Sequence, residues 1–321
     1  MTDRPLRVGL LGLGLHGGRY ARHLRAGEVP GLALHAAWTR SETRRAEAAA
    51  VGLPVVEAPE AILRDPEVDA VVLALPVGVQ TDRAAQALGA GKAVLVEKPL
   101  GERGARARAL AERGASRLTV AHTLRFDPLL VRLRDEARRM GPLVGFRFEQ
   151  RLEPRPVAWE DEPALAAGGV LVQTGVHALD ALRFCLADRL LALGVSRAEL
   201  GRRRTRAVED WAELGLSATL DREVVEGSVV SSKLGRSRHH RYALLFEDGG
   251  LEADFVDRCL YVTRGRERAA IPVPPVPTLV ALLGAFEAFV RGRADNPVPP
   301  EEGVAALELI DAAYARARAV P

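Results

Sequence analysis

Apolar runs alternate with amphipathic stretches over the first 122 residues. The apolar runs have the length and composition of buried strands and cover residues 6–14, 32–38, 68–76, 93–99 and 117–122. The amphipathic stretches have helical spacing and cover residues 16–27, an Arg/Glu/Ala-rich stretch ending near residue 51, residues 81–89 and residues 103–114. Continuous apolar strands between amphipathic helices are typical of a parallel sheet covered on both faces. We therefore predict a doubly wound α/β domain over residues 1–122.

The pattern changes after residue 125. Segments that alternate polar and apolar residues, or run apolar between turn residues, cover residues 144–152, 211–220, 224–232 and 241–247. Such segments are typical of antiparallel strands. Helical spacing returns at residues 173–187 and 300–320. The fold class expected is α/β, in which the parallel-sheet domain is followed by a C-terminal α+β domain over residues 123–321 with a largely antiparallel open sheet.

Composition narrows the function classes. Apolar residues make up 48% of the chain and charged residues 27%, and the formal net charge is only +3. The basic runs at residues 202–206 and 236–241 are interpreted as solvated loop surface, so nucleic acid is not expected as the main partner. The apolar stretch Ala269–Phe286 contains four prolines and is not expected to span a membrane.

Location and metal binding follow from two further features. The opening stretch MTDRPLRVGLLGLGL has no small-residue cleavage site and is interpreted as a strand and turn rather than a signal peptide. Cys185 and Cys259 have neither a disulfide framework nor metal-ligand spacing. We expect a cytoplasmic protein without a metal site and without a membrane partner.

A glycine motif follows the first predicted strand directly. Gly12, Gly14 and Gly17 have G-x-G-x-x-G spacing at the start of a predicted helix. Such glycines permit a tight turn, close approach of a pyrophosphate to the backbone, and close packing of helix on strand. The motif predicts dinucleotide binding by a Rossmann turn that includes Leu15 and His16, with a purely structural turn as the alternative.

The end of the second predicted strand indicates which dinucleotide is bound. A carboxylate for the ribose 2′-hydroxyl is expected about twenty residues after the glycines, but Thr39, Arg40 and Ser41 occupy this place. Two hydroxyls and a guanidinium suit a 2′-phosphate, which a carboxylate would repel. We predict a preference for NADP(H), with NAD(H) as the alternative. Arg40 could instead stack on the adenine or point into solvent.

A lysine stands where the fourth predicted strand ends. The chain has 45 basic residues, of which only Lys92, Lys98 and Lys233 are lysines. Strands of a doubly wound sheet present their carboxyl ends to the cofactor crevice, which assigns Glu97 and Lys98 to the nicotinamide region. The same argument assigns Leu75 and Pro76, at the end of the third predicted strand, to cofactor binding. Pro99 is expected to turn the chain away, with a cis bond as one option. The alternative for Lys98 is a surface lysine beside a turn.

Four motifs in order and at matching spacing make the chain resemble a known family over nearly its full length. They are GLGLHG (12–17), VLVEKPL (94–100), RFDP (125–128) and GGVLVQTGVHALDAL (168–182). The chain resembles the glucose-fructose oxidoreductase, inositol dehydrogenase and MocA-like (Gfo/Idh/MocA) oxidoreductases. The resemblance implies a dinucleotide domain followed by a substrate-binding domain whose sheet makes the contacts of a homodimer or homotetramer.

The resemblance also implies roles for individual residues. It assigns Lys98 to binding of the reacting oxygen, and His177 to acid–base work. Many members have an aspartate four residues before that histidine, whereas this chain has Gln173. Helical spacing places Gln173, His177 and Asp180 on one face, so either of the other two could orient or pair with the imidazole. The alternatives are a structural helix-face acid bonded in the domain interface at Asp180, and a packed core histidine at His177.

Residues assigned to the substrate side are Thr123, Arg125 and Trp159, with Gln80, Arg151 and Arg155 as further candidates. Each has a structural alternative. We expect an enzyme, an NAD(P)-dependent oxidoreductase that moves a hydride between the nicotinamide and a secondary alcohol or ketone of a sugar, cyclitol or similar polyol. The alternatives are a cofactor-retaining glycoside lyase or hydrolase with transient redox chemistry, and a non-catalytic dinucleotide-sensing protein.

Overall fold

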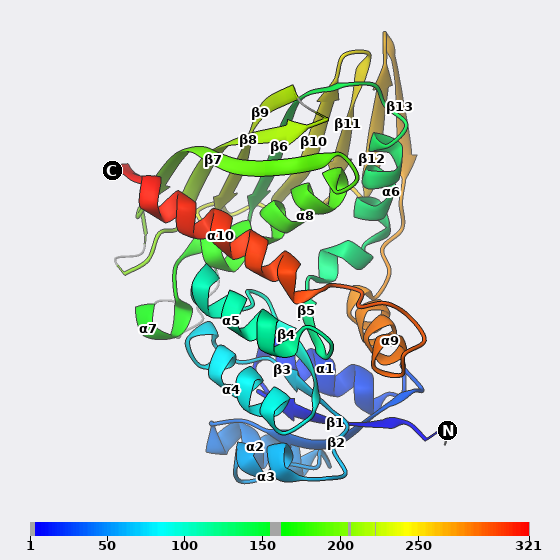
Figure 1. Ribbon diagram of the computed structural model, residues 1–321, viewed down its shortest axis with the longest axis vertical. Helices are drawn as coiled ribbons and strands as arrows, with labels where there is room; N and C mark the ends of the chain where they lie inside the picture. Colours follow the sequence, from blue (N-terminus) through cyan, green and yellow to red (C-terminus); the bar gives the residue numbers. More distant parts are fainter. Residues whose placement is uncertain (1–3, 155–161, 205–206, 222, 321) are drawn as a thin grey trace. The chain divides into compact units, whose positions relative to one another are not determined.

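The computed structural model describes residues 4–154, 162–204, 207–221 and 223–320. The chain divides into two compact units, each described by itself (Figure 1). The N-terminal unit comprises Met1–His122 and Pro277–Val304, and the C-terminal unit comprises Thr123–Val276 and Ala305–Pro321.

The N-terminal unit contains a parallel sheet with strand order β2-β1-β3-β4-β5 in its described residues. The strands are β1 (Leu6–Leu11), β2 (Leu32–Trp38), β3 (Ala70–Leu73), β4 (Ala93–Glu97) and β5 (Leu118–Ala121). The helices after them are α1 (Leu15–Arg25), α2 (Glu42–Ala50), α3 (Pro59–Arg64), α4 (Val77–Gly89) and α5 (Gly104–Gly114). β3 and β4 are buried along their whole length, because helices cover both faces of the sheet. The predicted parallel α/β sheet is confirmed.

One segment differs from the expected domain division. Residues 277–304, expected in the second domain, belong to the N-terminal unit. The segment holds α9 (Thr278–Val290) and the start of α10 (Pro300–Arg316). Hydrogen bonds attach this segment to the rest of the N-terminal unit. Arg291 donates to the carbonyl of Arg4 at 2.6 Å, and Asn296 donates to the carbonyl of Leu118 at 2.7 Å. The amide of Val120 donates to the carbonyl of Val298 at 3.1 Å.

The C-terminal unit is built on a sheet with strand order β13-β12-β11-β10-β6-β9-β8-β7-β14 in its described residues. The strands are β6 (Leu143–Arg151), β7 (Leu190–Gly201), β8 (Trp211–Leu220), β9 (Glu223–Ser232), β10 (His239–Phe246), β11 (Gly249–Asp254), β12 (Cys259–Arg264), β13 (Glu267–Pro272) and β14 (Arg318–Val320). Only the β6–β9 and β7–β14 pairs among these strands are parallel. The expected largely antiparallel sheet is confirmed.

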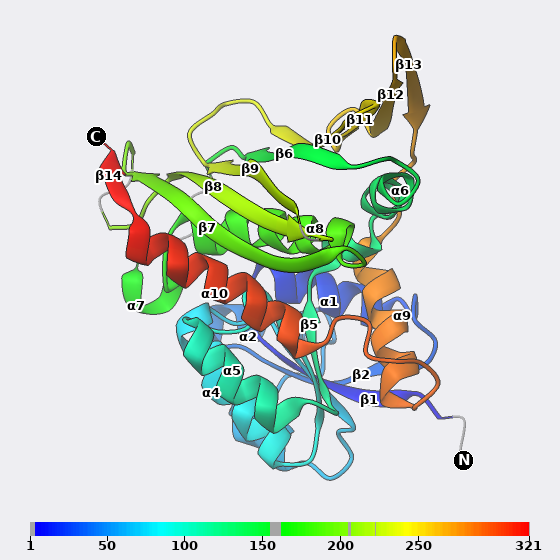
Figure 2. The same ribbon diagram turned by 45° about the horizontal axis from the view of Figure 1, so that its top comes forward.

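The helical elements of this unit include the 3₁₀ turn η1 (Thr123–Phe126), α6 (Pro128–Ala137), α7 (Pro163–Ala166), the π-helical turn η3 (Leu171–Gly175) and α8 (Val176–Leu186). Of these, α6, η3 and α8 contact strands of the sheet. Figure 2 shows α8 along one face of the sheet, and its residues Ala178, Leu179 and Leu182 are fully buried. Among the described residues, the helical run Ala164–Leu186 has the length and hydropathy of a membrane span, but 72% of its most apolar window is buried. The run is therefore explained as the core helix of this unit.

Candidate functional site

The glycine turn between β1 and α1 needs two of its glycines for close backbone contacts. Gly12 has a φ of +104°, and a Cβ built on it would lie 2.2 Å from the carbonyl oxygen of Ala74. A Cβ on Gly17 would lie 1.8 Å from the carbonyl oxygen of Gly12. No side chain caps the N-terminus of α1, and its first turn has no acid. The turn therefore has the backbone geometry and the positive helix end that suit a pyrophosphate.

Gly14 has a different neighbour. A Cβ on Gly14 would meet a guanidinium nitrogen of Arg44, Nη1, at 3.4 Å. Arg44 therefore places a positive charge directly at the glycine turn. The sequence analysis did not assign Arg44, because it stands four residues beyond Arg40 inside a run of helix-forming residues.

The three residues predicted to select NADP(H) have mixed surroundings. Thr39 is buried, and its carbonyl oxygen accepts a hydrogen bond from Arg45 at 2.7 Å. The hydroxyl of Ser41 caps α2 by accepting from the amide of Arg44 at 3.3 Å. Arg40 is exposed. No carboxylate belongs to this set, which leaves the strand end without the usual recognition of a ribose 2′-hydroxyl.

Leu75 and Pro76, assigned to the cofactor, follow β3. The side chain of Leu75 lies 3.2 Å from the Cβ position of Gly12, so these two predicted residues are brought together. Pro76 stands directly before α4. Leu15 and His16, in the glycine motif, have exposed side chains. These residues occupy the carboxyl-end edge of the sheet, where doubly wound folds bind nucleotides.

The turn after β4 is held rigidly from two sides. The side chain of Gln80 is fully buried and donates to the carbonyl oxygens of Glu97 at 2.6 Å and Pro99 at 2.9 Å. The hydroxyl of Tyr20 donates to Oε1 of Glu97 at 2.9 Å, and Nδ1 of His16 lies 3.9 Å from the same oxygen. The Lys98–Pro99 peptide is cis, which was one of the options left open from the sequence.

Tyr20 was not identified from the sequence. Burial, followed by the charge of Glu97, raises the pKa of the Tyr20 phenol well above its usual value. The phenol therefore stays protonated and keeps donating to Glu97. This bond ties α1, which follows the glycine turn, to the end of β4, which carries Lys98. A lone tyrosine among the arginines, histidines and glycines of α1 was the available signal.

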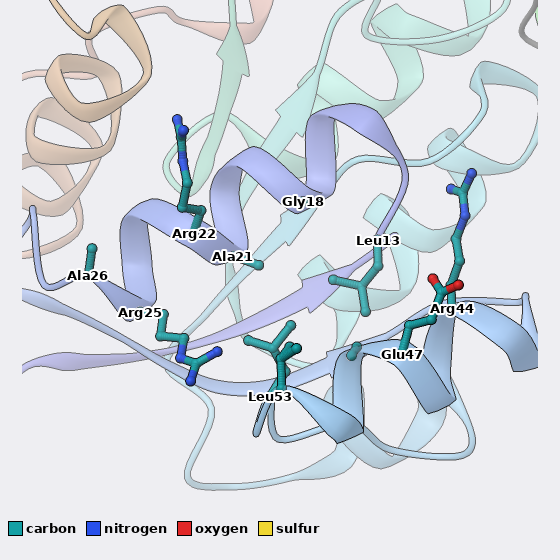
Figure 3. Close-up of a pocket in the computed structure, with 11 residues that line it drawn as sticks. Leu13, Gly18, Ala21, Arg22, Arg25, Ala26, Arg44, Glu47 and Leu53 are labelled. Atoms are coloured by element: carbon teal, nitrogen blue, oxygen red, sulfur yellow. The ribbon is translucent and has the colours of Figure 1, made fainter.

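A cavity of about 660 Å³ lies beside this edge, along α1 and α2 (Figure 3). Arg25 and Arg44 stand at its opposite ends, and its wall includes Leu13, Ala21 and Leu53. The cavity begins next to the glycine turn but includes neither Thr39–Ser41 nor Glu97–Lys98. It is therefore not the place where the predicted chemistry would occur.

In the C-terminal unit, a buried carboxylate holds the segment that carries Gln173 and His177. Glu209 accepts hydrogen bonds from the amides of Gly169 at 3.0 Å and Leu171 at 3.2 Å, and from the hydroxyl of Tyr314 at 2.8 Å. A Cβ on Gly169 would lie 2.0 Å from the carbonyl oxygen of Glu209, so only glycine fits there. Glu209 thus satisfies backbone amides just before and at the start of η3, although it lies far away in sequence.

Asp180 is paired within its own unit. Its carboxylate accepts from Nε of Arg125 at 3.1 Å and from Nη2 at 2.7 Å, and it is 1% exposed. The Arg125 guanidinium also lies over the ring of Phe184, at 5.3 Å from the centroid. This ion pair gives both Asp180 and Arg125 a structural function. That Asp180 acts on the His177 imidazole, and that Arg125 contacts a substrate, both stay predictions. Thr123 is the first residue of η1, the 3₁₀ turn that also contains Arg125.

Gln173 has contacts at both ends of its amide. Its oxygen accepts a hydrogen bond from the ammonium of Lys233, and its Nε2 donates to the carbonyl oxygen of Gly168 at 3.3 Å. Lys233 had not been assigned to the site from the sequence. Arg151 pairs with Glu149. Trp159 and Arg155 lie outside the described residues.

Comparisons with known proteins agree with this geometry. The model of an oxidoreductase family with an NAD-binding Rossmann fold matches residues 6–122. YdgJ, an uncharacterized oxidoreductase of Escherichia coli (strain K12), is 26% identical over 343 aligned positions, which cover 97% of this chain and 96% of YdgJ. The inositol 2-dehydrogenase of Acidothermus cellulolyticus is 28% identical over 260 positions, which cover 77% of this chain and 72% of the relative.

A solved structure has the same fold. KijD10, a 3-ketoreductase from Actinomadura kijaniata solved with NADP and TDP-benzene, aligns with a TM-score of 0.85 and 23% identity over 98% of this chain and 99% of its own. The family model and the relatives bear on more than the fold, because they match the segment that carries the glycine turn and the Glu97–Lys98–Pro99 turn. Residues 6–122 thus match the Gfo/Idh/MocA family of oxidoreductases with an NAD-binding Rossmann fold, and relatives of the longer chain include an inositol 2-dehydrogenase and the rhizopine catabolism protein MocA of Rhizobium meliloti.

Proposed function

We propose that the protein moves a hydride between NADP(H) and a secondary alcohol or ketone of a sugar, cyclitol or similar polyol. The observation that carries the proposal is the edge of the N-terminal sheet. There the glycine turn, with Gly12 against Leu75, stands at the same edge as the clamped turn that presents Lys98. The relative from Acidothermus cellulolyticus is an inositol 2-dehydrogenase, which supports a ring-bound secondary hydroxyl as the reacting group.

The bound nicotinamide supplies or accepts the hydride. In this proposal, the ammonium of Lys98 donates a hydrogen bond to the reacting oxygen and stabilises the negative charge that develops on it. During oxidation, an imidazole nitrogen of His177 takes the hydroxyl proton as the hydride leaves carbon, and during reduction it returns that proton. Gln80, Tyr20 and Glu97 hold the lysine turn in place.

The proposed preference for NADP(H) is supported by two exposed guanidiniums, one just after β2 and one in α2. Arg40 stands where a ribose-binding carboxylate is usual, and Arg44 stands at Gly14. A 2′-phosphate would receive charge-assisted hydrogen bonds from such groups, whereas the 2′-hydroxyl of NAD(H) would not need them.

A second candidate function keeps the cofactor without net redox change, as in a glycoside lyase or hydrolase. The observation that favours it is Gln173, a neutral residue where an aspartate is common in the resembled family, and one that is bonded to Lys233. A cofactor that remains bound through purification and returns to its starting oxidation state after turnover would support this candidate. A non-catalytic sensing protein would bind dinucleotide tightly and turn over none of the substrates.

The experiment that tests the proposal is a screen of sugars, cyclitols and polyols with NADP⁺ and with NAD⁺, read from the absorbance of the reduced nicotinamide. We expect reduction of NADP⁺ by at least one polyol, with a lower KM for NADP⁺ than for NAD⁺. Tight cofactor binding without reduction by any alcohol, and without oxidation by the matching ketones, would contradict it.

We also propose a cytoplasmic homodimer or homotetramer assembled through the C-terminal sheet. Four of the large apolar side chains exposed in the described chain lie on strands of this sheet: Val144, Leu191, Val224 and Leu245. Light scattering of the purified protein and of Leu245→Lys tests the assembly, since a monomeric wild-type protein would contradict it.

A further inference from the structure

The use of lysine in this chain is selective. Of its 45 basic residues only three are lysines. Lys92 has a structural role in the N-terminal unit, where its ammonium donates to the carbonyl oxygens of Asp65 at 2.5 Å and Val68 at 2.7 Å. Lys98 is assigned to the reacting oxygen. The remaining lysine, Lys233, has no part in the mechanism described above.

Lys233 is fixed directly beside the segment that carries His177. It follows β9, and its backbone amide donates to the carbonyl oxygen of Asp210 at 2.8 Å. Its ammonium donates to the amide oxygen of Gln173. The backbone of Gln173 is also held in place, because its backbone N–H donates to the carbonyl oxygen of Gly169 at 2.9 Å.

Gln173 lies in η3 and His177 in the first turn of α8, one turn apart on the same side of a continuous helical run. A charge held at residue 173 therefore lies close to the imidazole. We propose that Lys233 is a positioning residue for His177: it locks the Gln173 amide in one orientation and keeps a positive charge one helical turn from the ring. This inference rests on the function proposed above.

The expected effect is electrostatic. A positive charge near an imidazole disfavours the protonated ring, so Lys233 keeps His177 in the neutral form that accepts a proton. The other charged groups on the surrounding elements have partners of their own: Glu209 before β8 binds backbone amides and Tyr314, Arg125 of η1 binds Asp180 of α8, Arg134 of α6 binds Asp135, and Glu149 of β6 binds Arg147 and Arg151. Further groups on the surrounding elements are Arg183 of α8, the neutral, buried His240 of β10, and Asp210 before β8, whose carboxylate accepts from the backbone amides of Arg203 and Arg204.

The test is an NMR titration of the His177 ring in the cofactor-saturated enzyme labelled at histidine, with His177→Asn to assign the signal. Lys233→Met should raise the pKa of His177 by about half to one unit, because it removes a nearby positive charge. The acid limb of kcat/KM for alcohol oxidation should move upward by the same amount. Lys233→Arg restores the charge and should return the titration close to its wild-type position.

Lys92→Met is the matched control, since it removes a lysine from the other unit and should leave the His177 titration unchanged. Gln173→Glu is the second variant: it retains Lys233 and adds a negative charge, so it too should raise the pKa of His177. The inference is overturned if Lys233→Met leaves the pKa of His177 unchanged. If Lys233→Met does not fold, an unchanged pKa of His177 in Gln173→Glu overturns it instead. The titration needs no turnover, so it gives an answer even if the proposed reaction fails.

Discussion

At the scale of single residues, the glycine turn shows how backbone contacts determine side-chain identity. Gly12 and Gly17 approach backbone oxygens so closely that any Cβ would overlap them. Gly14 has no such contact and faces the Arg44 guanidinium instead. Gly12 and Gly17 are therefore required by the fold, whereas Gly14 leaves room for a ligand beside a positive charge.

Arg44→Ala should reduce the affinity for NADP⁺ by about tenfold or more, because a charge-assisted bond to phosphate contributes about 1.5–3 kcal/mol. The affinity for NAD⁺ should change by less than about twofold, since that cofactor lacks the 2′-phosphate. Calorimetric titration of both cofactors measures the two effects without turnover. Arg113→Ala, at an exposed arginine of α5, is the matched control, and equal losses for both cofactors in Arg44→Ala would contradict this role.

The residues that the sequence analysis identified share one property, which is that a short local motif marks them. Gly12, Lys98 and His177 stand in such motifs. Arg44, Glu209 and Lys233 were missed because their partners are distant in sequence: Lys233 meets Gln173 across 60 residues, and Glu209 meets Gly169 across 40. Spacing along the chain contains no information about such pairs.

At the scale of elements, the start of the His177 segment depends on one side chain from another part of the chain. Glu209→Gln replaces a carboxylate that accepts from two backbone amides and from Tyr314. We expect the free energy of unfolding to fall by about 1.5–3 kcal/mol, as for hydrogen bonds to a buried charged group. Urea denaturation measures the change. Tyr314→Phe removes only one of these bonds and should cost less; an equal or larger loss would contradict the assignment.

The parallel strands of the N-terminal unit were predictable because burial on both faces makes them continuous apolar runs. β7, β11, β12 and β13 were not predicted from the sequence. β13 is largely exposed, and β7 mixes exposed and buried positions without a regular period, so neither gives a two-residue pattern. The π-helical turn at η3 was also missed, because its wider hydrogen bonding leaves no distinct sequence signal.

At the scale of the whole molecule, the pH dependence of stability follows from a buried imidazole. His240 stacks on Phe255 with ring centroids 4.2 Å apart, and burial lowers its pKa to about 3. The unfolded chain takes up this proton near the ordinary pKa of about 6.5. The contribution of neutral His240 is therefore fully present above about pH 6.5 and is lost as the pH falls toward 3, by about 1.4 kcal/mol per unit.

His240→Phe should remove this part of the acid sensitivity, because phenylalanine preserves an aromatic ring and takes up no proton. Urea denaturation between pH 6 and pH 4 measures how the free energy of unfolding depends on pH, and this slope should be lower than that of the wild-type protein by about 1.4 kcal/mol per pH unit. His239→Phe is the matched control at the neighbouring, half-exposed position. A slope that is the same in His240→Phe and in the wild-type protein would show that another group controls acid unfolding.

The central claim is that Lys98, presented by the clamped turn after β4, stabilises the reacting oxygen during hydride transfer. The most direct measurement is single-turnover hydride transfer by Lys98→Ala, followed by nicotinamide absorbance, together with calorimetric titration of NADP⁺. We expect the rate to fall by at least about a hundredfold, because the transition state loses its positively charged donor. The affinity for NADP⁺ should stay nearly unchanged. A rate equal to that of the wild-type enzyme would contradict the claim.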